Sequence, residues 1–306
     1  MNPDMGTSLE EILQGLCETQ KTISSKYFYD EHGSELFMEI TRQPEYYLTR
    51  TEIGLLRHYA DEITQEIGED CLLIEYGSGS SEKIRILLEN LRPMAYVPLD
   101  ISKEYLAAAA GALALEFPWL EVHATCLDFT DDFRLPFTMD AKRVAFFPGS
   151  SIGNFGRTET GEFLARVRRL VGQGGGMLIG VDLKKDPALL NAAYNDANGI
   201  TESFNLNILN HLNEKFDADF DVSEFEHLAE YEADRGCVAM YLRSRANQEV
   251  DIAGTQIKFS AGERIHTENS HKYFADEFID MARDAGFSEH KLWTDADEWF
   301  GVFYLS

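Results

Sequence analysis

The turn after the first long apolar run has the composition of a ligand-binding turn. Residues 74–79 read IEYGSG, and a helix is predicted to begin near Ser80 or Ser81. Glycines at a strand-to-helix turn, here Gly77 and Gly79, let the backbone approach a ligand that rests on the helix N-terminus. A dinucleotide fingerprint would need a third glycine at position 82, where Glu82 would repel a pyrophosphate. The turn therefore disfavours NAD.

Acidic residues follow the next two apolar runs. Asp100 ends AYVPLD, at the place where a carboxylate accepts hydrogen bonds from ribose hydroxyls. Asp128 and Phe129 end EVHATCLDF, where they can bind an adenine amino group and cover its ring. These positions together with the GxG turn predict S-adenosylmethionine as the cofactor, because its cationic sulfonium tolerates nearby carboxylates.

The elements that must position these residues alternate between strand and helix. Short apolar runs ending in Gly or Asp are separated by helical lengths, which is typical of a parallel sheet covered on both faces. We therefore predict a doubly wound α/β fold. The predicted strands are CLLIEYG, AYVPLD, EVHATCLDF, RVAFFPGS and GGMLIGVDL, and the helices between them cover 81–91, 102–115 and 159–172.

The alternation stops after Leu183, which indicates an insertion. Residues 184–216 read as helix with two breaks, whereas 237–244 and 250–265, with an Ala-Gly turn, read as antiparallel strands. A final helix and strand return to the α/β pattern. We predict an N-terminal helical segment, 1–58, that joins the substrate domain, a cofactor-binding core at 59–185 and 274–306, and an inserted α+β substrate-binding domain at 186–273.

Composition disfavours two classes of partner. The 306 residues include 53 Asp or Glu and 27 Lys or Arg, a formal net charge of −26, which disfavours nucleic acids and anionic membranes. The hydrophobic fraction of 44% is enough for a large core. Neither the four scattered cysteines nor the eight histidines show metal-ligand spacing, and no apolar run is long enough for a membrane span. We expect a cytoplasmic protein without a metal.

Five segments resemble the histidine Nα-methyltransferases of ergothioneine biosynthesis, in the same order along the chain. The resemblance implies a class I methyltransferase core with an added substrate domain. It also implies the conversion of L-histidine to its trimethylammonium betaine, hercynine, by three transfers from S-adenosylmethionine. The segments are YFYDEHGSELFMEITRQPEYYLTRTE (27–52), LIEYGSGSSEK (73–83), FFPGSSIGNF (146–155), AYNDANGITESFNLNIL (193–209) and FSAGERIHTENSHKY (259–273).

The resemblance assigns site residues by motif. The cofactor set is Tyr29, Gly77, Gly79, Lys83, Asp100, Asp128 and Phe129. Residues for the substrate's carboxylate and amine are Asn154 and Tyr194, those for the imidazole are Tyr46, Glu268 and Ser270, and those lining the pocket are Phe37, Gly149 and Met240. Leu48 and Asn269 depart from the family pattern, which often has proline and an apolar residue there. The resemblance identifies neither a catalytic residue nor a protein partner.

The imidazole set also makes chemical sense without the family. Glu268 and Ser270 lie two apart on a predicted strand, so they would point to one face and offer an acceptor and a donor to the two ring nitrogens.

Two alternatives to this function stay open. One is a methyltransferase of the same family that acts on another amino acid, such as tryptophan, and the other is a non-catalytic cofactor-binding protein.

Overall fold

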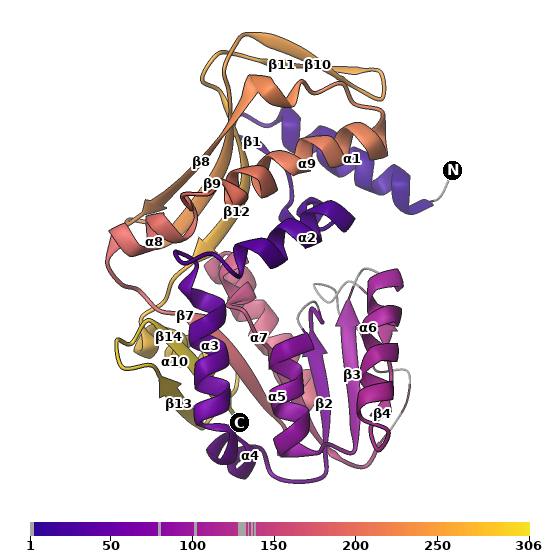
Figure 1. The fold of residues 1–306 in the computed structure, drawn as a ribbon, viewed down its shortest axis with the longest axis vertical. Helices are drawn as coiled ribbons and strands as arrows, with labels where there is room; N and C mark the ends of the chain where they lie inside the picture. The colour runs from indigo at the N-terminus through magenta and orange to yellow at the C-terminus, as the bar shows by residue number, and fades with distance from the viewer. Residues whose placement is uncertain are drawn as a thin grey trace. The chain divides into compact units, whose positions relative to one another are not determined.

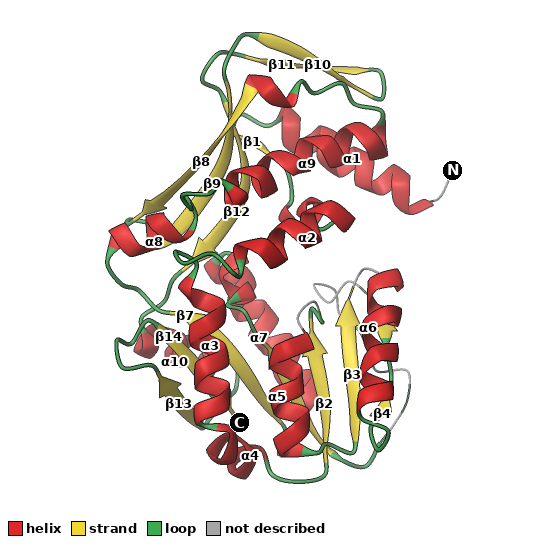
Figure 2. Cartoon of the chain, viewed as in Figure 1, coloured by secondary structure: helices red, strands yellow, loops and turns green. Residues whose placement is uncertain are grey.

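A computed structural model describes residues 3–78, 81–100, 103–127, 133, 135, 137 and 139–306. The chain divides into two compact units (Figures 1 and 2). Unit 1 comprises Met1–Tyr47 and Lys185–Ser270, and unit 2 comprises Leu48–Lys184 and His271–Ser306. Within the described ranges, no helix is long and apolar enough to cross a membrane.

Unit 2 is built around an eight-stranded sheet with the order β13-β14-β7-β6-β2-β3-β4, in which β5 also pairs with β3. Strand β14 runs antiparallel to its neighbours, β7 and β13, and the other strand pairs among the described residues of this sheet are parallel. The strands are β2 (Cys71–Tyr76), β3 (Ala95–Asp100), β4 (Glu121–Val122), β5 (Thr125–Cys126), β6 (Lys142–Phe147), β7 (Gly176–Asp182), β13 (His290–Thr294) and β14 (Phe300–Leu305).

Both faces of the central strands β2 and β7 are buried, which explains their apolar runs. Leu72, Ile74 and Tyr76 of β2 pack in one cluster with side chains of α7 and α10, while the residues between them are buried on the opposite face. This confirms the doubly wound α/β prediction. The helices of the unit are α3 (Tyr47–His58), α4 (Ala60–Ile67), α5 (Ser81–Leu91), α6 (Lys103–Glu116), α7 (Arg157–Val171) and α10 (Ala275–Asp284), with a 3-10 turn, η2, at Ser151–Asn154.

Unit 1 contains a four-stranded sheet with the order β1-β12-β9-β8 and a separate hairpin of β10 and β11. The hairpin has the Ala-Gly turn that the sequence predicts, at residues 253–254. The strands are β1 (Lys21–Thr22), β8 (Phe225–Glu232), β9 (Cys237–Ser244), β10 (Gln248–Ile252), β11 (Thr255–Phe259) and β12 (Arg264–His271). The helical elements are α1 (Pro3–Cys17), η1 (Ser25–Phe28), α2 (Glu31–Ile40), α8 (Pro187–Ala193), α9 (Ile200–Phe216) and η3 (Val222–Glu224).

The long helix α9 forms the centre of unit 1. It packs against α2, η1, β8 and β9. Its Phe204 stacks on Phe28 with ring centroids 4.5 Å apart. The first turn is held by the Asp196 carboxylate, which accepts hydrogen bonds from the backbone N–H groups of Ile200 and Thr201 at 2.9 and 2.7 Å.

Several predicted boundaries differ from the structure. The segment 48–58 lies in unit 2, because α3 bonds to α5 and to the loop after β6, so the N-terminal piece of unit 1 ends at Tyr47 and not at residue 58. The inserted piece is Lys185–Ser270, not 186–273. Within the described residues 121–127 of EVHATCLDF, the structure has the two-residue strands β4 and β5 with a break between them. The sequence does not predict strands β8 and β13, because their charged residues mask the alternation of apolar and polar side chains that is typical of a strand.

Candidate active site

The carboxyl end of β2 is the switch point of the unit 2 sheet, because β3 and β6 flank β2 on opposite sides. Ligands of open α/β sheets bind at such points. Gly77 there has a φ of +74°, a conformation that favours glycine, and its N–H donates to the Leu99 carbonyl at 2.9 Å. The turn is thereby fixed beside Asp100, which ends β3 and is half-buried.

The neighbouring Ser78 has an unsatisfied polar group. The side chain is buried, and its Oγ has no hydrogen-bond partner in the described part of the chain. A buried hydroxyl without a partner at a switch point fits a polar ligand that would satisfy it. Three members of the predicted cofactor set, Gly79, Asp128 and Phe129, lie outside the described residues.

Glu75 adds a buried carboxyl group beneath this turn. The Tyr96 hydroxyl donates to its Oε2, while Oε1 has no partner among the described residues. Burial raises the pKa of Glu75 to about 8, with the Asp100 and Glu52 charges adding to the effect. The group is therefore mostly protonated at neutral pH. Neither the motifs nor the spacing assigns Glu75 a role, although an acidic residue inside an apolar strand is a recognisable signal.

Lys83, another predicted cofactor residue, forms a buried ion pair. Its Nζ lies 2.5 Å from Glu52 Oε2, and both side chains are almost fully buried. The Glu52 carboxylate also accepts the Gly149 N–H, with N–O distances of 3.0 and 2.9 Å. One carboxylate thus holds α3, α5 and the loop after β6 together. Sequence reasoning missed Glu52, although it lies four residues from both Leu48 and Leu56 on the buried face of α3.

The loop after β6 carries two predicted substrate residues, Gly149 and Asn154. Ser150 between them adopts a left-handed φ of +58°, which is uncommon for a residue with a side chain. Its Oγ accepts the Asp182 N–H at 2.9 Å, and this bond helps to fix the conformation. Asn154 is half-buried at the end of η2, beyond the carboxyl end of β6. The loop is therefore anchored to β7 as well as to α3.

Unit 1 brings three of the predicted substrate residues together. The Tyr194 hydroxyl donates to Ser270 Oγ at 2.7 Å, although 76 positions separate them. The Tyr46 ring meets the Tyr194 ring edge-on, with centroids 6.2 Å apart. All three side chains are buried. Aromatic faces and hydroxyls from three separate segments thus gather in one place.

Strand β12 does not alternate regularly through the TENS motif. Thr267 donates to Asn205 of α9 and Ser270 accepts from Tyr194, whereas Asn269 bonds to His266 at 2.9 Å. Residues 266 and 269 could not share a face in a regular strand, so the alternation breaks at Glu268. Sequence reasoning treated the strand as regular and missed this break.

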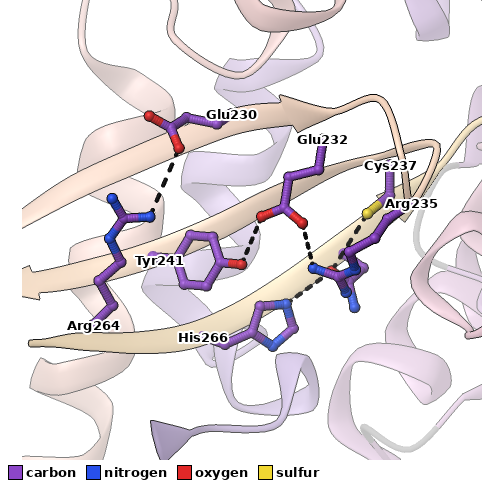
Figure 3. A network of polar contacts seen from close by, with 8 residues as sticks. Glu230, Glu232, Arg235, Cys237, Tyr241, Arg264 and His266 are labelled. Atoms are coloured by element: carbon purple, nitrogen blue, oxygen red, sulfur yellow. Dashed lines mark hydrogen bonds and ion pairs between the residues drawn. The ribbon is translucent and has the colours of Figure 1, made fainter. Parts of the chain in front are cut away.

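Asn269 belongs to a polar network that includes Arg235 and His266 (Figure 3). Arg235 donates to Asn269 at 3.0 Å and to Glu232 at 2.7 Å, and the Tyr241 hydroxyl donates to Glu232 at 2.8 Å. The departure from the family pattern at Asn269 is therefore accommodated away from Ser270.

Two of the remaining predicted residues of unit 1, Tyr29 and Phe37, contact Phe204. Tyr29 and Phe37 meet edge-on at 5.8 Å, and each also contacts the Phe204 ring. Met240 is buried in β9, and its carbonyl oxygen lies 3.1 Å from Thr267 Oγ1. Tyr29, assigned to the cofactor set, thus lies in unit 1, whereas Gly77, Lys83 and Asp100 lie in unit 2.

The two units offer different chemistry. Unit 2 presents the Gly77 turn, the Asp100 carboxylate and the unsatisfied Ser78 hydroxyl at the carboxyl ends of β2 and β3. This set suits a nucleoside ligand. Unit 1 presents tyrosine and serine hydroxyls with aromatic rings, which suits a small polar molecule that carries a ring. Across the described positions, no group of three or more His, Cys, Asp or Glu side chains could hold a metal ion.

The comparisons with known proteins agree on one family. Residues 8–306 match the family model described as "Histidine-specific methyltransferase, SAM-dependent". A histidine N-alpha-methyltransferase of Mycolicibacterium smegmatis is 38% identical over 299 residues, which cover 95% of this chain and 92% of the relative. One from Mycobacterium tuberculosis is 37% identical with the same coverage. Ergothioneine biosynthesis protein 1 of Neurospora crassa is 32% identical over 91% of this chain and 32% of its own length.

Proposed function

Because this chain belongs to the histidine-specific, S-adenosylmethionine-dependent methyltransferase family, we propose that it methylates the α-amino group of L-histidine three times. The product is Nα,Nα,Nα-trimethylhistidine, hercynine, formed in the first step of ergothioneine biosynthesis. The observation that carries the proposal is the buried contact of Tyr194 with Ser270, next to Tyr46, in the unit whose segments match the substrate motifs. Identity of 37–38% with two curated histidine N-alpha-methyltransferases supports the same substrate.

S-Adenosylmethionine supplies a methyl group on a sulfonium, and the residues of unit 2 fit it. Gly77 leaves room for close approach, the Ser78 hydroxyl needs a partner, and in this proposal the half-buried Asp100 accepts from the ribose hydroxyls. The protonated Glu75 adds no charge beneath the turn. Lys83 serves the cofactor indirectly, since its ammonium pairs with Glu52 and fixes the start of α5.

The protein has to hold the substrate amine in its neutral form, because an ammonium has no lone pair. A water-poor site disfavours the charged form and so lowers the pKa of the amine. Tyr194, Tyr46 and Ser270 are all buried, which fits such a site. Each transfer releases a proton, and the final trimethylammonium is a permanent cation that the aromatic faces can accept. Most of the rate gain then comes from orientation.

In this proposal, recognition of the imidazole ring makes the enzyme selective for histidine. Glu268 is the acceptor for one ring N–H, and Ser270 serves the other nitrogen. A site with such polar groups penalises a purely apolar ring, because the groups would lose their partners. Tryptophan is the natural competitor among the alternatives, since its indole offers one N–H donor and no acceptor nitrogen.

The test is a screen with labelled S-adenosylmethionine and each of the twenty amino acids, read by the transfer of label. Histidine should take up label far faster than the others. Transfer to tryptophan with histidine inert would replace the proposal by its same-family alternative. Cofactor binding without transfer to any amino acid would indicate a binding protein.

A further inference from the structure

A closed circuit, made of hydrogen bonds and of short stretches of the covalent chain, includes the Tyr194–Ser270 contact. From Ser270 the chain leads back along β12 to Thr267, whose Oγ1 donates to Asn205 Oδ1 at 2.8 Å. Asn205 Nδ2 lies 2.8 Å from His227 Nδ1, and His227 Nε2 lies 3.0 Å from the Tyr194 carbonyl oxygen. The Tyr194 hydroxyl then closes the circuit on Ser270. Every member belongs to unit 1.

The direction of each bond in the circuit follows from its partners. Asn205 Nδ2 also donates to the Tyr241 carbonyl at 3.0 Å, so both of its hydrogens are used and Oδ1 takes the Thr267 hydroxyl. An amide nitrogen only donates, so His227 Nδ1 accepts and His227 Nε2–H donates to Tyr194. Burial lowers the pKa of His227, which keeps the ring in this neutral form.

Asn205 is the centre of the arrangement and is completely buried. It lies on α9, between the segment that carries Tyr194 and the strand that carries Ser270. The break of alternation at Glu268 comes directly after Thr267, so the Asn205–Thr267 bond fixes the strand where the irregular residue begins.

We propose that Asn205 and His227 are positioning residues for the amino acid substrate, which set the spacing between Tyr194 and the Thr267–Ser270 stretch of β12. The inference rests on the proposed function, because it takes these two segments as the substrate-binding ones. Neither residue touches the substrate in this proposal. Their loss should weaken histidine binding and leave the cofactor site of unit 2 unaffected.

The experiment compares Asn205→Ala with a matched control on the same helix. Asn213 also lies on α9 and makes two side-chain bonds, to the carbonyl and N–H of Phe220 at 2.9 and 2.8 Å, but neither reaches Tyr194 or β12. Full-length wild type, Asn205→Ala and Asn213→Ala are assayed for the histidine KM, for kcat and, by calorimetry, for the S-adenosylmethionine Kd. Thr267→Val, which removes one hydroxyl and keeps the branched shape, covers the case in which Asn205→Ala fails to fold.

We expect Asn205→Ala to raise the histidine KM by at least about tenfold and Thr267→Val by several-fold, with the cofactor Kd changed by less than about twofold. Asn213→Ala should keep the wild-type histidine KM. His227→Gln can still donate to the Tyr194 carbonyl, so its KM should rise less than that of His227→Ala.

Two results would overturn the inference: a wild-type histidine KM in folded Asn205→Ala or Thr267→Val, or an equal rise in Asn213→Ala. A wild-type enzyme that does not methylate histidine would instead contradict the proposed function, so the two failures are distinguishable.

Discussion

At the scale of single residues, Glu75 should leave a signature in the pH dependence of stability. Its pKa is about 8 in the folded protein and 4.5 when exposed, so the stability it contributes is fully present below pH 4.5 and is lost as the pH rises to about 8. The loss approaches about 1.4 kcal/mol per pH unit. The side chain of the Glu75→Gln variant cannot ionise. Its unfolding free energy, measured with urea, should therefore increase relative to that of the wild type as the pH rises over this range. If the unfolding free energies of the wild type and of Glu75→Gln changed with pH in parallel, the pKa of Glu75 would not be raised in the folded protein.

Asp100 provides a second test at the residue scale. Asp100→Ala removes the carboxylate that we place on the ribose, where each bond to a charged group contributes roughly 1.5–3 kcal/mol. S-Adenosylmethionine binding, measured by calorimetry, should weaken by at least about tenfold. A folded Asp100→Ala protein with the wild-type Kd would mean that the ribose binds elsewhere.

Glu268 is the corresponding test on the substrate side. In the proposed site the Glu268 carboxylate accepts from the ring N–H. Glu268→Ala should therefore raise the histidine KM by a factor that corresponds to a loss of about 2–3 kcal/mol of binding free energy. The cofactor Kd should stay the same, and an amino acid with an apolar ring should become a relatively better substrate. Unchanged histidine kinetics would make Glu268 a structural residue of β12.

Predictability at this scale depended on sequence separation. The Gly77 turn and Asp100 were readable because strand ends and turns are local features. The buried pairs were not: Gly149 is 97 positions from Glu52, and Thr267 is 62 positions from Asn205. No local pattern indicates which distant partner a buried polar side chain will meet. The break at Glu268 was hidden for the same reason, because it follows from side-chain bonds to α9 and to the β8–β9 turn.

At the scale of elements, helix α3 and strand β7 meet through Glu52 and Gly180. A methyl group on Gly180 would lie 2.1 Å from Glu52 Oε1, so glycine is required for the helix to approach the strand. Gly180→Ala should cost about 1–3 kcal/mol of stability through overpacking. Glu52→Ala should cost about 3–5 kcal/mol, because it leaves the Lys83 charge buried without its partner.

The double variant Gly180→Ala/Glu52→Ala separates this contact from general damage. Removing the carboxylate removes the two closest contacts of the added methyl group and leaves the Phe300 ring at 3.0 Å. The loss of unfolding free energy in the double variant, measured with urea, should therefore fall short of the sum of the two single losses by about 1 kcal/mol or more. Gly161→Ala on α7 is the control, since its added methyl would meet nothing within 4 Å. Simple additivity would show that α3 and β7 adjust independently of each other.

Elements were predictable where burial is two-sided and uninterrupted. The apolar runs of β2, β3, β6 and β7 identify themselves because both faces of each strand are covered. Strand β8, with the sequence FEHLAEYE, has one face that pairs charges, such as Glu226 with Arg243 at 2.7 Å, and its pattern resembles a polar loop. Packing and pairing decide such strands, and both depend on distant parts of the chain.

At the scale of the whole molecule, the order of motifs along the chain was the informative feature. The doubly wound core and an insertion after Leu183 follow from where strand–helix alternation stops and resumes. The position of α3 did not follow, because its membership of unit 2 depends on bonds from Glu52 to α5 and to the β6 loop. The net charge of −26 agrees with a small-molecule substrate in preference to a polyanionic partner.

The most direct test of the account is the structure of the product. The purified chain is incubated with S-adenosylmethionine and L-histidine, and the product is analysed by fragmentation mass spectrometry. We predict three methyl groups, all on the α-nitrogen, with an unmodified imidazole ring. A methyl group on a ring nitrogen, or histidine recovered unchanged while the cofactor is consumed with another amino acid, would contradict the account.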